Sequence, residues 1–360
     1  MKTNHILIMR FSALGDVAMM VPVVWSLARQ YPHLRITVLS KPFARPFFEN
    51  IADNVGFMAA DVKKEYHGVR GLNTLYRRLI AKHFTAIADF HDVLRTKFLR
   101  LRFDLSRHRV AHINKHRYGK RKLTAANGKI LIQQPTSFEN YAEVLDKLGY
   151  PVKLEFTSIF PEGRGDWSLL NDNSSNQNNE NTIAPKKENE KWIGVAPFAA
   201  HAGKIYPLKK TEEIISKLHN QYPNSRIFLF GGGEKELAVL DRWTQQYKRC
   251  TCVARAIKGL GKELILMSYL DVMVSMDSAN MHLASLTGIP VVSIWGATHP
   301  YAGFMGWNQQ ESNAIQVELP CRPCSIYGNK PCMRGDLACL NSIEPDTVLK
   351  TITMLLERNN

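Results

Sequence analysis

The sequence predicts an α/β protein built from two Rossmann-like, doubly wound domains with parallel sheets, which face one another across a cleft. In both halves, short apolar strand patterns alternate with helical patterns, and a strongly polar stretch separates the halves. The chain of 360 residues is longer than one typical domain. Its hydrophobic content of 45% is enough for two cores.

The first half opens as a β-α-β unit. Residues 5–9 predict an apolar strand, a short turn leads into a helix over 17–30, and residues 36–40 predict the next strand. Two further strands and the helix that closes this half are expected at 86–90, 110–113 and 141–148.

The second half restarts the same alternation. Residues 171–191 contain almost nothing that can enter a core, so they predict a flexible linker or surface loop. After a strand at 192–197, the next elements are expected at 211–221, 226–233, 234–248 and 272–276. We expect an N-terminal domain at 1–165 and a C-terminal domain at 192–345, joined by a linker at 166–191. A C-terminal helix at 346–360 is expected to pack back on the first domain.

The most informative stretch is VSMDSANMHLASLTGIPVVSIWGATHP, residues 274–300, which holds a strand end, a helix and a second strand. Asp277 and Ser278 are good N-cap residues, and helical spacing follows them. A helix that begins directly after a strand aims its N–H groups and positive dipole end at the carboxyl edge of the sheet. Ser278 and Ala279 are small enough to let a diphosphate approach, and His282 adds a donor one turn later.

RFSALGDV, residues 10–17, joins the first strand to the first helix. This places Asp16 at the carboxyl edge of the sheet, where ligands of open α/β folds bind. A carboxylate there can take a proton from an attacking hydroxyl, but Asp is also a favoured N-cap residue and Asp16 can simply cap the helix. A dinucleotide-binding loop is not expected, because one glycine replaces the three of GxGxxG.

Two loops of the second half carry further candidates. Lys204, in the small-residue loop PFAAHAGKIYPL at 197–208, can neutralise a leaving diphosphate, although a solvated surface lysine is equally common. The glycines of GGGEKE, 231–236, permit close approach of a nucleoside, and Glu234 can accept hydrogen bonds from ribose hydroxyls. A tight turn with a helix-capping acid explains that motif as well.

Polar and basic residues in the first half predict a site for an acceptor. Asp89, His91 and Arg95 lie within two helical turns and can line a pocket, although core or surface hydrogen bonding explains each of them alone. Basic residues crowd 107–122, which predicts an anionic acceptor or membrane face, or equally a solvated loop. With Ser12 of the first loop, the candidate acceptor-binding residues are Ser12, Asp89, His91, Arg95, Arg117 and Lys120.

Charge narrows the class of partner. The chain has 47 Lys and Arg against 32 Asp and Glu, which gives a net charge of +15 and a pI near 9.5. Such a surface favours nucleic acid, anionic lipid headgroups or a phosphorylated glycan. No run reaches the roughly 18 to 20 apolar residues of a membrane span, and the N-terminus lacks the apolar stretch of a signal peptide. We therefore expect a cytoplasmic protein.

Four cysteines fall in CRPCSIYGNKPCMRGDLAC with the spacing C-x2-C-x7-C-x6-C. Four soft ligands on short loops can bind a tetrahedral structural zinc ion. The second pair lacks the close spacing of a zinc ribbon, so disulfides or free thiols stay open as alternatives. Cys250 and Cys252 are expected to be small buried hydrophobes. The candidate metal ligands are Cys321, Cys324, Cys332 and Cys339.

Taken in order along the chain, these motifs resemble the heptosyltransferases of glycosyltransferase family nine, which build the inner core of bacterial lipopolysaccharide. The resemblance rests on SALGDV at 12–17, the Lys204 loop, GGGE at 231–234, the long motif at 277–300 and the CRPC segment that follows. It implies a GT-B fold, an acceptor-binding N-terminal domain and a nucleotide-sugar-binding C-terminal domain. It also implies an inverting transfer that requires no metal cofactor, with ADP-heptose as the usual donor.

The resemblance further implies roles for single residues. Asp16 would be the general base, Glu234 would hold the nucleoside, and Asp277 would hold the sugar or the loop. Two departures from the family are that PFAAHAG lacks the Thr or Ser often found before the lysine, and that position 278 is Ser where many heptosyltransferases have Thr. The groups expected to stabilise the departing diphosphate are Lys204, Ser278, Ala279, Asn280 and His282.

The expected acceptor is an anionic lipid-linked glycan, reached by peripheral contact at the cytoplasmic face of the inner membrane. Two other classes compete with this interpretation. A sugar-nucleotide epimerase also uses two Rossmann-like domains and a diphosphate-binding helix, and it would isomerise its donor without an acceptor. A basic nucleic-acid-binding protein would explain the charge, but no aromatic stacking platform or reading helix is recognisable, so no nucleic-acid partner is expected.

Overall fold

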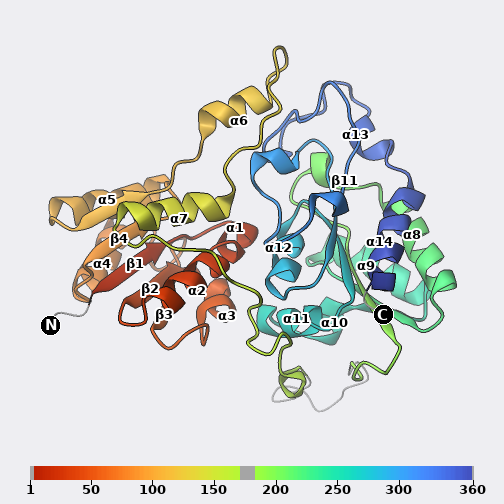
Figure 1. Cartoon of the computed structure of the whole chain (residues 1–360), viewed down its shortest axis with the longest axis horizontal. Helices are drawn as coiled ribbons and strands as arrows, with labels where there is room; N and C mark the ends of the chain where they lie inside the picture. Colours follow the sequence, from red (N-terminus) through yellow and green to blue (C-terminus); the bar gives the residue numbers. More distant parts are fainter. Residues whose placement is uncertain (1–3, 171–182, 359–360) are drawn as a thin grey trace. The chain divides into compact units, whose positions relative to one another are not determined.

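The computed structural model describes residues 4–170 and 183–358 (Figure 1). The chain divides into two compact units, each described here by itself. The described residues form one parallel sheet in each unit, which confirms the predicted α/β class. The first unit comprises Met1–His116 and Pro135–Ile159, and the second comprises Arg117–Gln134 and Phe160–Asn360.

The sheet of the first unit has five parallel strands in the order β3-β2-β1-β4-β5. The strand order reverses between β1 and β4, so the carboxyl ends of these two strands flank the switch point where open α/β sheets bind ligands. The strands are β1 His5–Met9, β2 Arg35–Ser40, β3 Val55–Ala59, β4 Ala86–Asp89 and β5 Arg109–His112. The helices are α1 Leu14–Ala18, α2 Val21–Gln30, α3 Arg45–Phe48, α4 Gly68–Ile80, α5 Leu94–Leu105 and α7 Ser137–Lys147.

The first helix differs from its prediction. One helix was expected over 17–30, but the chain forms α1, breaks at residues 19–20 and restarts as α2 with Pro22 in its first turn. Proline lacks the N–H that a helix interior needs but is tolerated in the first turn, so the restart falls where proline fits. The short α1 keeps Asp16 close to the end of β1.

Alternate residues of β1 point to opposite faces of the sheet. Leu7 and Met9 belong to a core that also contains residues of α4 and α5, such as Leu75 and Phe103. The helices α2 and α7 contact one another elsewhere in the unit. Burial of these side chains fixes the strand register and thereby the position of the loops after β1 and β4.

The sheet of the second unit has six parallel strands in the order β11-β10-β9-β6-β7-β8. Its switch point lies between β6 and β9, so the loops that follow these two strands form the expected ligand-binding edge. The strands are β6 Lys191–Ala196, β7 Ser225–Leu229, β8 Cys250–Cys252, β9 Val272–Met276, β10 Val291–Ile294 and β11 Ala314–Ile315. The helices are α6 Arg117–Leu123, α8 Leu208–Gln221, α9 Glu234–Gln246, α10 Val253–Ala256, α11 Leu260–Met267, α12 Ala279–Leu286, α13 Ala338–Asn341 and α14 Pro345–Arg358.

The compact units divide the chain at other points than the expected boundaries. Residues 117–134, expected in the first domain, pack in the second unit, where the Gln134 N–H donates to Tyr301 O at 2.8 Å and Lys129 Nζ donates to Pro323 O at 3.0 Å. Charge and polarity along the sequence do not reveal such an excursion, because the contacts that hold it are main-chain carbonyls far away in the sequence.

The expected linker at 166–191 is partly packed as well. Trp167 lies against Trp192 with ring centroids 5.6 Å apart, and Lys186 pairs with Asp271 at 2.7 Å, all within the second unit. Its most polar part, 171–182, lies outside the described residues.

The C-terminal helix α14 was expected to pack back on the first domain. In the structure its apolar face lies in the core of the second unit, where Val348 and Ile352 are fully buried with Ile215 and Leu218 of α8. α8 and α14 each present an apolar stripe, and burying the two together removes both from water. Within the two described ranges, no helix is long and apolar enough to cross a membrane.

Candidate active site

Asp16 lies in α1, at the carboxyl edge of β1. Its Oδ2 forms an ion pair with Arg10 Nη2 at 2.7 Å and accepts a hydrogen bond from the Ala13 N–H at 3.0 Å. Asp16 therefore does cap the start of its helix, as the alternative interpretation expected. Its side chain also stays 31% exposed, so a substrate hydroxyl can reach the carboxylate.

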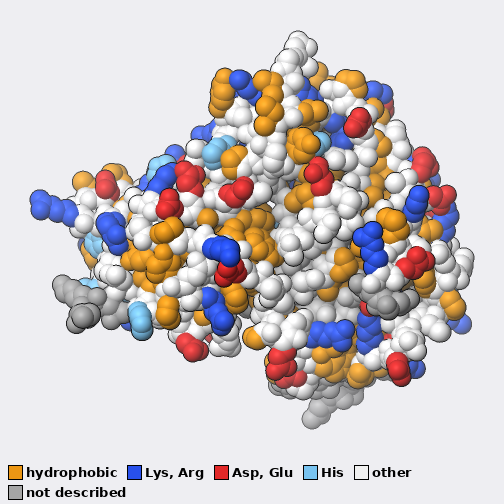
Figure 2. All heavy atoms as spheres, viewed as in Figure 1, with side chains coloured by type: hydrophobic (Ala, Val, Ile, Leu, Met, Phe, Trp, Pro, Cys, Tyr) orange, Lys and Arg blue, Asp and Glu red, His pale blue; other side chains and the backbone are white. Residues whose placement is uncertain are grey.

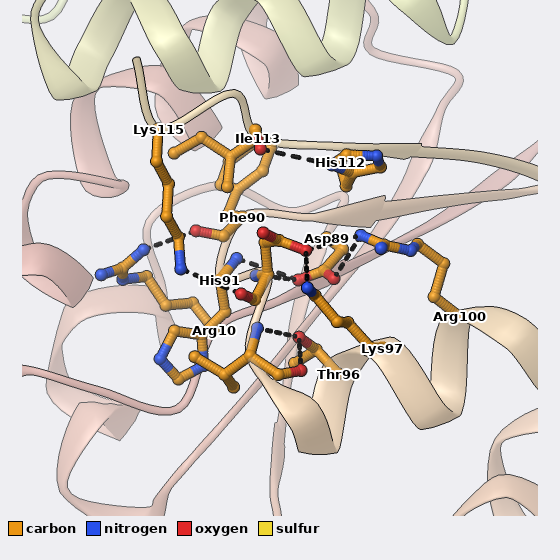
Figure 3. Close-up of polar contacts among 12 residues, drawn as sticks. Arg10, Asp89, Phe90, His91, Thr96, Lys97, Arg100, His112, Ile113 and Lys115 are labelled. Carbon is orange, nitrogen blue, oxygen red and sulfur yellow. Dashed lines mark hydrogen bonds and ion pairs between the residues drawn. The ribbon is translucent and has the colours of Figure 1, made fainter. Parts of the chain in front are cut away.

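Arg10 is the important residue of this site that sequence reasoning missed. Its side chain is buried, and Nη1 donates to Phe90 O at the end of β4 (Figure 3). The guanidinium lies 5.7 Å from the centroid of the Tyr141 ring, and the Tyr141 hydroxyl donates to Asp16 O at 3.1 Å. The signal for Arg10 that the sequence did offer is its position directly after a buried strand. The side chain ties the loops after β1 and β4 together around Asp16.

His91 contacts the same loop from the end of β4. Nδ1 accepts the Phe11 N–H at 3.4 Å, and Nε2 lies 3.3 Å from Ser12 Oγ. Burial, with the nearby charges of Arg10 and Lys115, lowers the pKa of His91 to about 3, so the ring is neutral at pH 7. Since Nδ1 accepts, the proton sits on Nε2 and is donated to Ser12. His91 and Ser12, two predicted acceptor-binding residues, thus form one hydrogen-bonded pair beside Asp16.

Asp89 was expected to bind an acceptor, and the structure corrects this. The residue is fully buried, and Oδ1 accepts the N–H groups of His91 and Asp92, both at 2.9 Å (Figure 3). Its Oδ2 pairs with Arg100 Nη1 at 3.1 Å. The Asp89 carboxylate therefore holds the turn after β4 and balances a neighbouring guanidinium, and no part of it is exposed to solvent.

The remaining acceptor candidates do not form one cluster. Arg95 is exposed on α5 of the first unit. Arg117 and Lys120 lie on α6 of the second unit, where Arg117 is exposed and the buried Lys120 places Nζ 4.3 Å from the centroid of the Phe304 ring. The predicted acceptor set is therefore divided between the two units.

In the second unit, the loops after β6 and β9 meet through Lys204 and Asp277. Lys204 Nζ lies 3.1 Å from Asp277 Oδ2, and the two side chains are 15% and 5% exposed. A Cβ on Gly328 would overlap the Lys204 side chain, so Lys204 packs directly on that glycine. The structure thus holds the ammonium group immediately before α12, and the interpretation of Lys204 as a solvated surface lysine is wrong.

The start of α12 has no side-chain cap. Ser278 is the N-cap residue, yet its hydroxyl does not cap the helix and instead lies 3.2 Å from Ser275 Oγ. The N–H groups of the first turn, at Ala279 and Asn280, point toward the edge where Lys204 is held. His282 is buried later in the same turn. The Lys204 ammonium, balanced by the Asp277 carboxylate, and the positive end of the helix dipole thus lie at the carboxyl end of β9.

Glu234 begins α9, after Gly233 with a φ of +83°. The neighbouring acid Glu236 caps the turn, since its Oε2 accepts the Gly232 N–H at 2.8 Å. The carboxylate of Glu234 is exposed at the same end of the sheet. The capping role that the sequence left open for Glu234 therefore belongs to Glu236.

The cysteines divide into two groups, and all six are free thiols. Cys250 and Cys252 are buried in β8, as expected of small hydrophobes. Among the described residues, no three Cys, His, Asp or Glu side chains are already arranged to share a metal ion. The four residues of the C-terminal motif line one cavity of about 410 Å³ in the second unit: Cys321, Cys324, Cys332 and Cys339.

Comparison with known proteins places these features in a family. Residues 73–331 match the model of glycosyltransferase family 9 (heptosyltransferase). Over 297 residues the chain is 23% identical to lipopolysaccharide core heptosyltransferase OpsX of Haemophilus influenzae, which covers 81% of this chain and 79% of that protein. It is 25% identical over 135 residues to lipooligosaccharide heptosyltransferase 2 of Campylobacter jejuni, covering 36% of this chain and 40% of that protein. The chain thus aligns with well under two thirds of the length of the Campylobacter relative.

Among solved structures, E. coli ADP-heptose lps heptosyltransferase II aligns with 99% of both chains at a TM-score of 0.68 and 17% identity. This likeness shows that the two parallel sheets form a GT-B fold. Because the family model covers more than half of the chain, the protein belongs to glycosyltransferase family 9, the heptosyltransferase family.

Proposed function

We propose that the protein transfers heptose from ADP-heptose to an inner-core lipopolysaccharide acceptor, by an inverting reaction without a catalytic metal ion. The observation that carries the proposal is the position of Lys204, whose ammonium group is held by Asp277 beside the start of α12, a helix end that no side chain caps. The E. coli relative is named for ADP-heptose, and the Haemophilus relative for the lipopolysaccharide core. Both names support this donor and this acceptor class.

The donor would bind at the carboxyl edge of the second sheet. The diphosphate would accept hydrogen bonds from the first-turn N–H groups of α12 and an ion pair from Lys204, with His282 as a further contact. Asp277 would keep Lys204 in place before the donor arrives. Glu234, exposed at the start of α9, is suited to accept hydrogen bonds from ribose hydroxyls.

The chemical step requires one base and one stabilised leaving group. The acceptor hydroxyl gives its proton to Asp16 while its oxygen forms a bond to the anomeric carbon on the side opposite the diphosphate. The bond between that carbon and the diphosphate oxygen breaks, so the configuration inverts and ADP leaves with an additional negative charge. Lys204 and the positive end of α12 supply the charge that a divalent cation supplies elsewhere.

Arg10 and His91 would act on Asp16 and not on the sugar. Arg10 holds the carboxylate at 2.7 Å, and His91 holds Ser12 in the loop that presents it. A fixed carboxylate loses little entropy when the acceptor binds, which is how positioning contributes to rate.

The acceptor and the membrane would be met by the segment 117–132. This segment combines exposed apolar side chains with exposed Arg and Lys on α6, and Figure 2 shows hydrophobic and basic side chains close together over this part of the surface. An apolar surface rimmed by cations fits the headgroup region of an anionic membrane. We propose peripheral contact with the cytoplasmic face of the inner membrane. The exposed apolar residues are Tyr118, Ile130, Leu131 and Ile132.

The test is transfer itself. Purified protein is incubated with ADP-heptose and a heptose-deficient lipopolysaccharide acceptor in buffer without added divalent cations, and the products are analysed by mass spectrometry. The proposal predicts an acceptor that is one heptose heavier and a stoichiometric amount of ADP. An isomerised donor formed without any acceptor would identify an epimerase instead, and no reaction with any sugar nucleotide would overturn the proposal.

A further inference from the structure

The four cysteines of the C-terminal motif surround one cavity inside the second unit. Three of them come from the loop that follows β11, and Cys339 comes from α13. Lys129, on the segment that returns from α6, lines the same cavity. The fold therefore brings the four thiols to one cavity.

The loop that carries them has little structure of its own. Residues 316–337 contain no helix or strand, and Gly328, Gly335 and Leu337 adopt positive φ. Long irregular segments inside a compact domain are uncommon, and small segments without a core of their own are usually held by disulfides or by a structural metal. No disulfide holds this loop, since its cysteines are free thiols. Four thiols beside one cavity are a donor set that suits a structural metal ion.

The charges around the cavity also favour a bound metal ion. Arg322 is 5% exposed, and its guanidinium donates to the carbonyl oxygens of Gly296 and Thr298 and to other uncharged acceptors. Lys129 Nζ donates to two further carbonyls, at Pro320 and Pro323. Within the described part of the chain neither cation pairs with a carboxylate, and no carboxylate lines the cavity. A buried cation needs a nearby anion, and the groups available to become one are the thiols.

We propose that Cys321, Cys324, Cys332 and Cys339 bind one thiophilic divalent cation, with zinc as the cation of choice. Each cysteine loses its thiol proton on binding, so the ion and four thiolates carry a net charge of −2. This charge lies beside the buried Arg322 and the less buried Lys129 and Lys330, all of which line the cavity. The side chains stand around the cavity wall, and ligation requires the four sulfurs to turn inward. Disulfide formation would instead need an oxidant, and it would leave Arg322 and Lys129 without an anion.

The site would also support the donor site, an effect that rests on the proposed function. The Cys324 N–H donates to Ala297 O at 3.0 Å, and the Ala297 N–H donates to Gly203 O at 2.8 Å, next to Lys204. Gly328, between the second and third cysteines, packs directly on the Lys204 side chain. Metal binding therefore orders the loop against which Lys204 rests.

The experiment measures the metal content of the protein and not its transferase activity. Protein expressed in zinc-supplemented medium and purified under reducing conditions is analysed for metal content, and the zinc environment is examined by X-ray absorption. We expect one zinc per chain with four sulfur neighbours at about 2.3 Å. The double variant Cys324→Ser/Cys332→Ser should lose the zinc, whereas Cys250→Ser/Cys252→Ser, with its two buried thiols in β8, should keep one equivalent.

Measurements on the wild type decide whether the four cysteines bind a metal ion, even if the first double variant does not fold. No tightly bound zinc or iron after reconstitution of reduced wild-type protein would overturn the proposal, as would nitrogen or oxygen ligands in place of four sulfurs. Since no donor is present, these results are independent of whether ADP-heptose is the substrate. For the supporting role, removal of the metal should weaken ADP binding by at least about tenfold, and restoring zinc should recover it.

Discussion

At the scale of single residues, the sequence predicted where Asp16 lies in the fold but not which residues contact it. Asp16 could be placed at a sheet edge because a buried strand and a short loop precede it. Its partner Arg10 could not be assigned, since the same arginine would be solvated if the loop after β4 lay elsewhere. Asp89 was misjudged for the related reason that a polar residue after a strand can serve either the turn or a ligand, and its hydrogen bonds to backbone N–H groups become visible only in three dimensions.

Replacing Asp16 by Asn tests the base. The variant keeps the shape of the side chain and loses the proton acceptor, so kcat for transfer should fall by at least about a hundredfold. ADP affinity should stay unchanged, because the donor contacts belong to the other unit. Near-normal turnover in a steady-state assay of the variant would remove Asp16 from the proton-transfer step.

The buried His91 gives a pH dependence of stability. Its pKa is about 3 in the folded protein and 6.5 when exposed, so below pH 6.5 the unfolded chain takes up a proton that the folded chain does not. Stability contributed by the neutral ring is complete above pH 6.5 and is lost as pH falls toward 3. His5 and His299, each with a pKa lowered to about 4 by burial, act in the same direction.

Denaturant unfolding at several pH values checks this. Between pH 6 and pH 4 the wild type should lose up to about 1.4 kcal/mol more per pH unit than His91→Gln, which cannot take up that proton. His5 and His299 remain in both proteins and cancel in the comparison. Parallel stability curves for the two proteins would show that His91 is not a buried neutral ring.

At the scale of elements, periodicity and turn residues predicted most strands and helices of both sheets close to their bounds. The edge strands β3, β8 and β11 and the irregular loop at 316–337 were not predicted, because their positions depend on partners and not on local pattern. The contact between Gly328 and Lys204 is another feature that local sequence pattern does not reveal. It joins a loop of the cysteine segment to the loop after β6, more than a hundred residues away.

A glycine substitution tests that contact. Gly328→Ala introduces a Cβ at a φ of +73° that overlaps the Lys204 side chain, so it should displace Lys204 and weaken ADP binding by at least about tenfold. Gly163→Ala is the matched control, since Gly163 has a φ of +79° and no atom near its Cβ position. Both variants carry the backbone strain of a positive φ, roughly 1 kcal/mol. Equal ADP affinities in the two variants would mean that Gly328 does not position Lys204.

At the scale of the whole molecule, the two-sheet architecture was predictable because the α/β pattern restarts after a polar stretch. The assignment of 117–134 to the second unit was not, and neither was the packing of α14, since both depend on which surfaces complement one another. The segment 117–134 also enters the proposed function. It carries the exposed basic and apolar side chains that we propose for membrane contact.

Vesicle binding tests this surface. Leu131→Ser/Ile132→Ser should reduce cosedimentation with phosphatidylglycerol-rich vesicles several-fold, because two exposed apolar side chains no longer enter the headgroup layer. Leu169→Ser is the control, since Leu169 is 53% exposed on another surface segment and Leu131 is 52% exposed. Wild-type binding should also weaken at high salt. Equal binding by all three proteins would exclude this segment as the membrane contact.

The most direct test of the central claim is a calorimetric titration of ADP, UDP, GDP and CMP into the wild type and into Lys204→Ala. It is done without added magnesium or manganese and without chelator, so that any thiol-bound zinc stays in place. The account predicts selective ADP binding that weakens by at least about tenfold in the variant, a change of about 1.4 kcal/mol. Preference for another nucleotide, or the same ADP affinity in both proteins, would contradict the assignment of Lys204 and the start of α12 as the site for the ADP-sugar diphosphate.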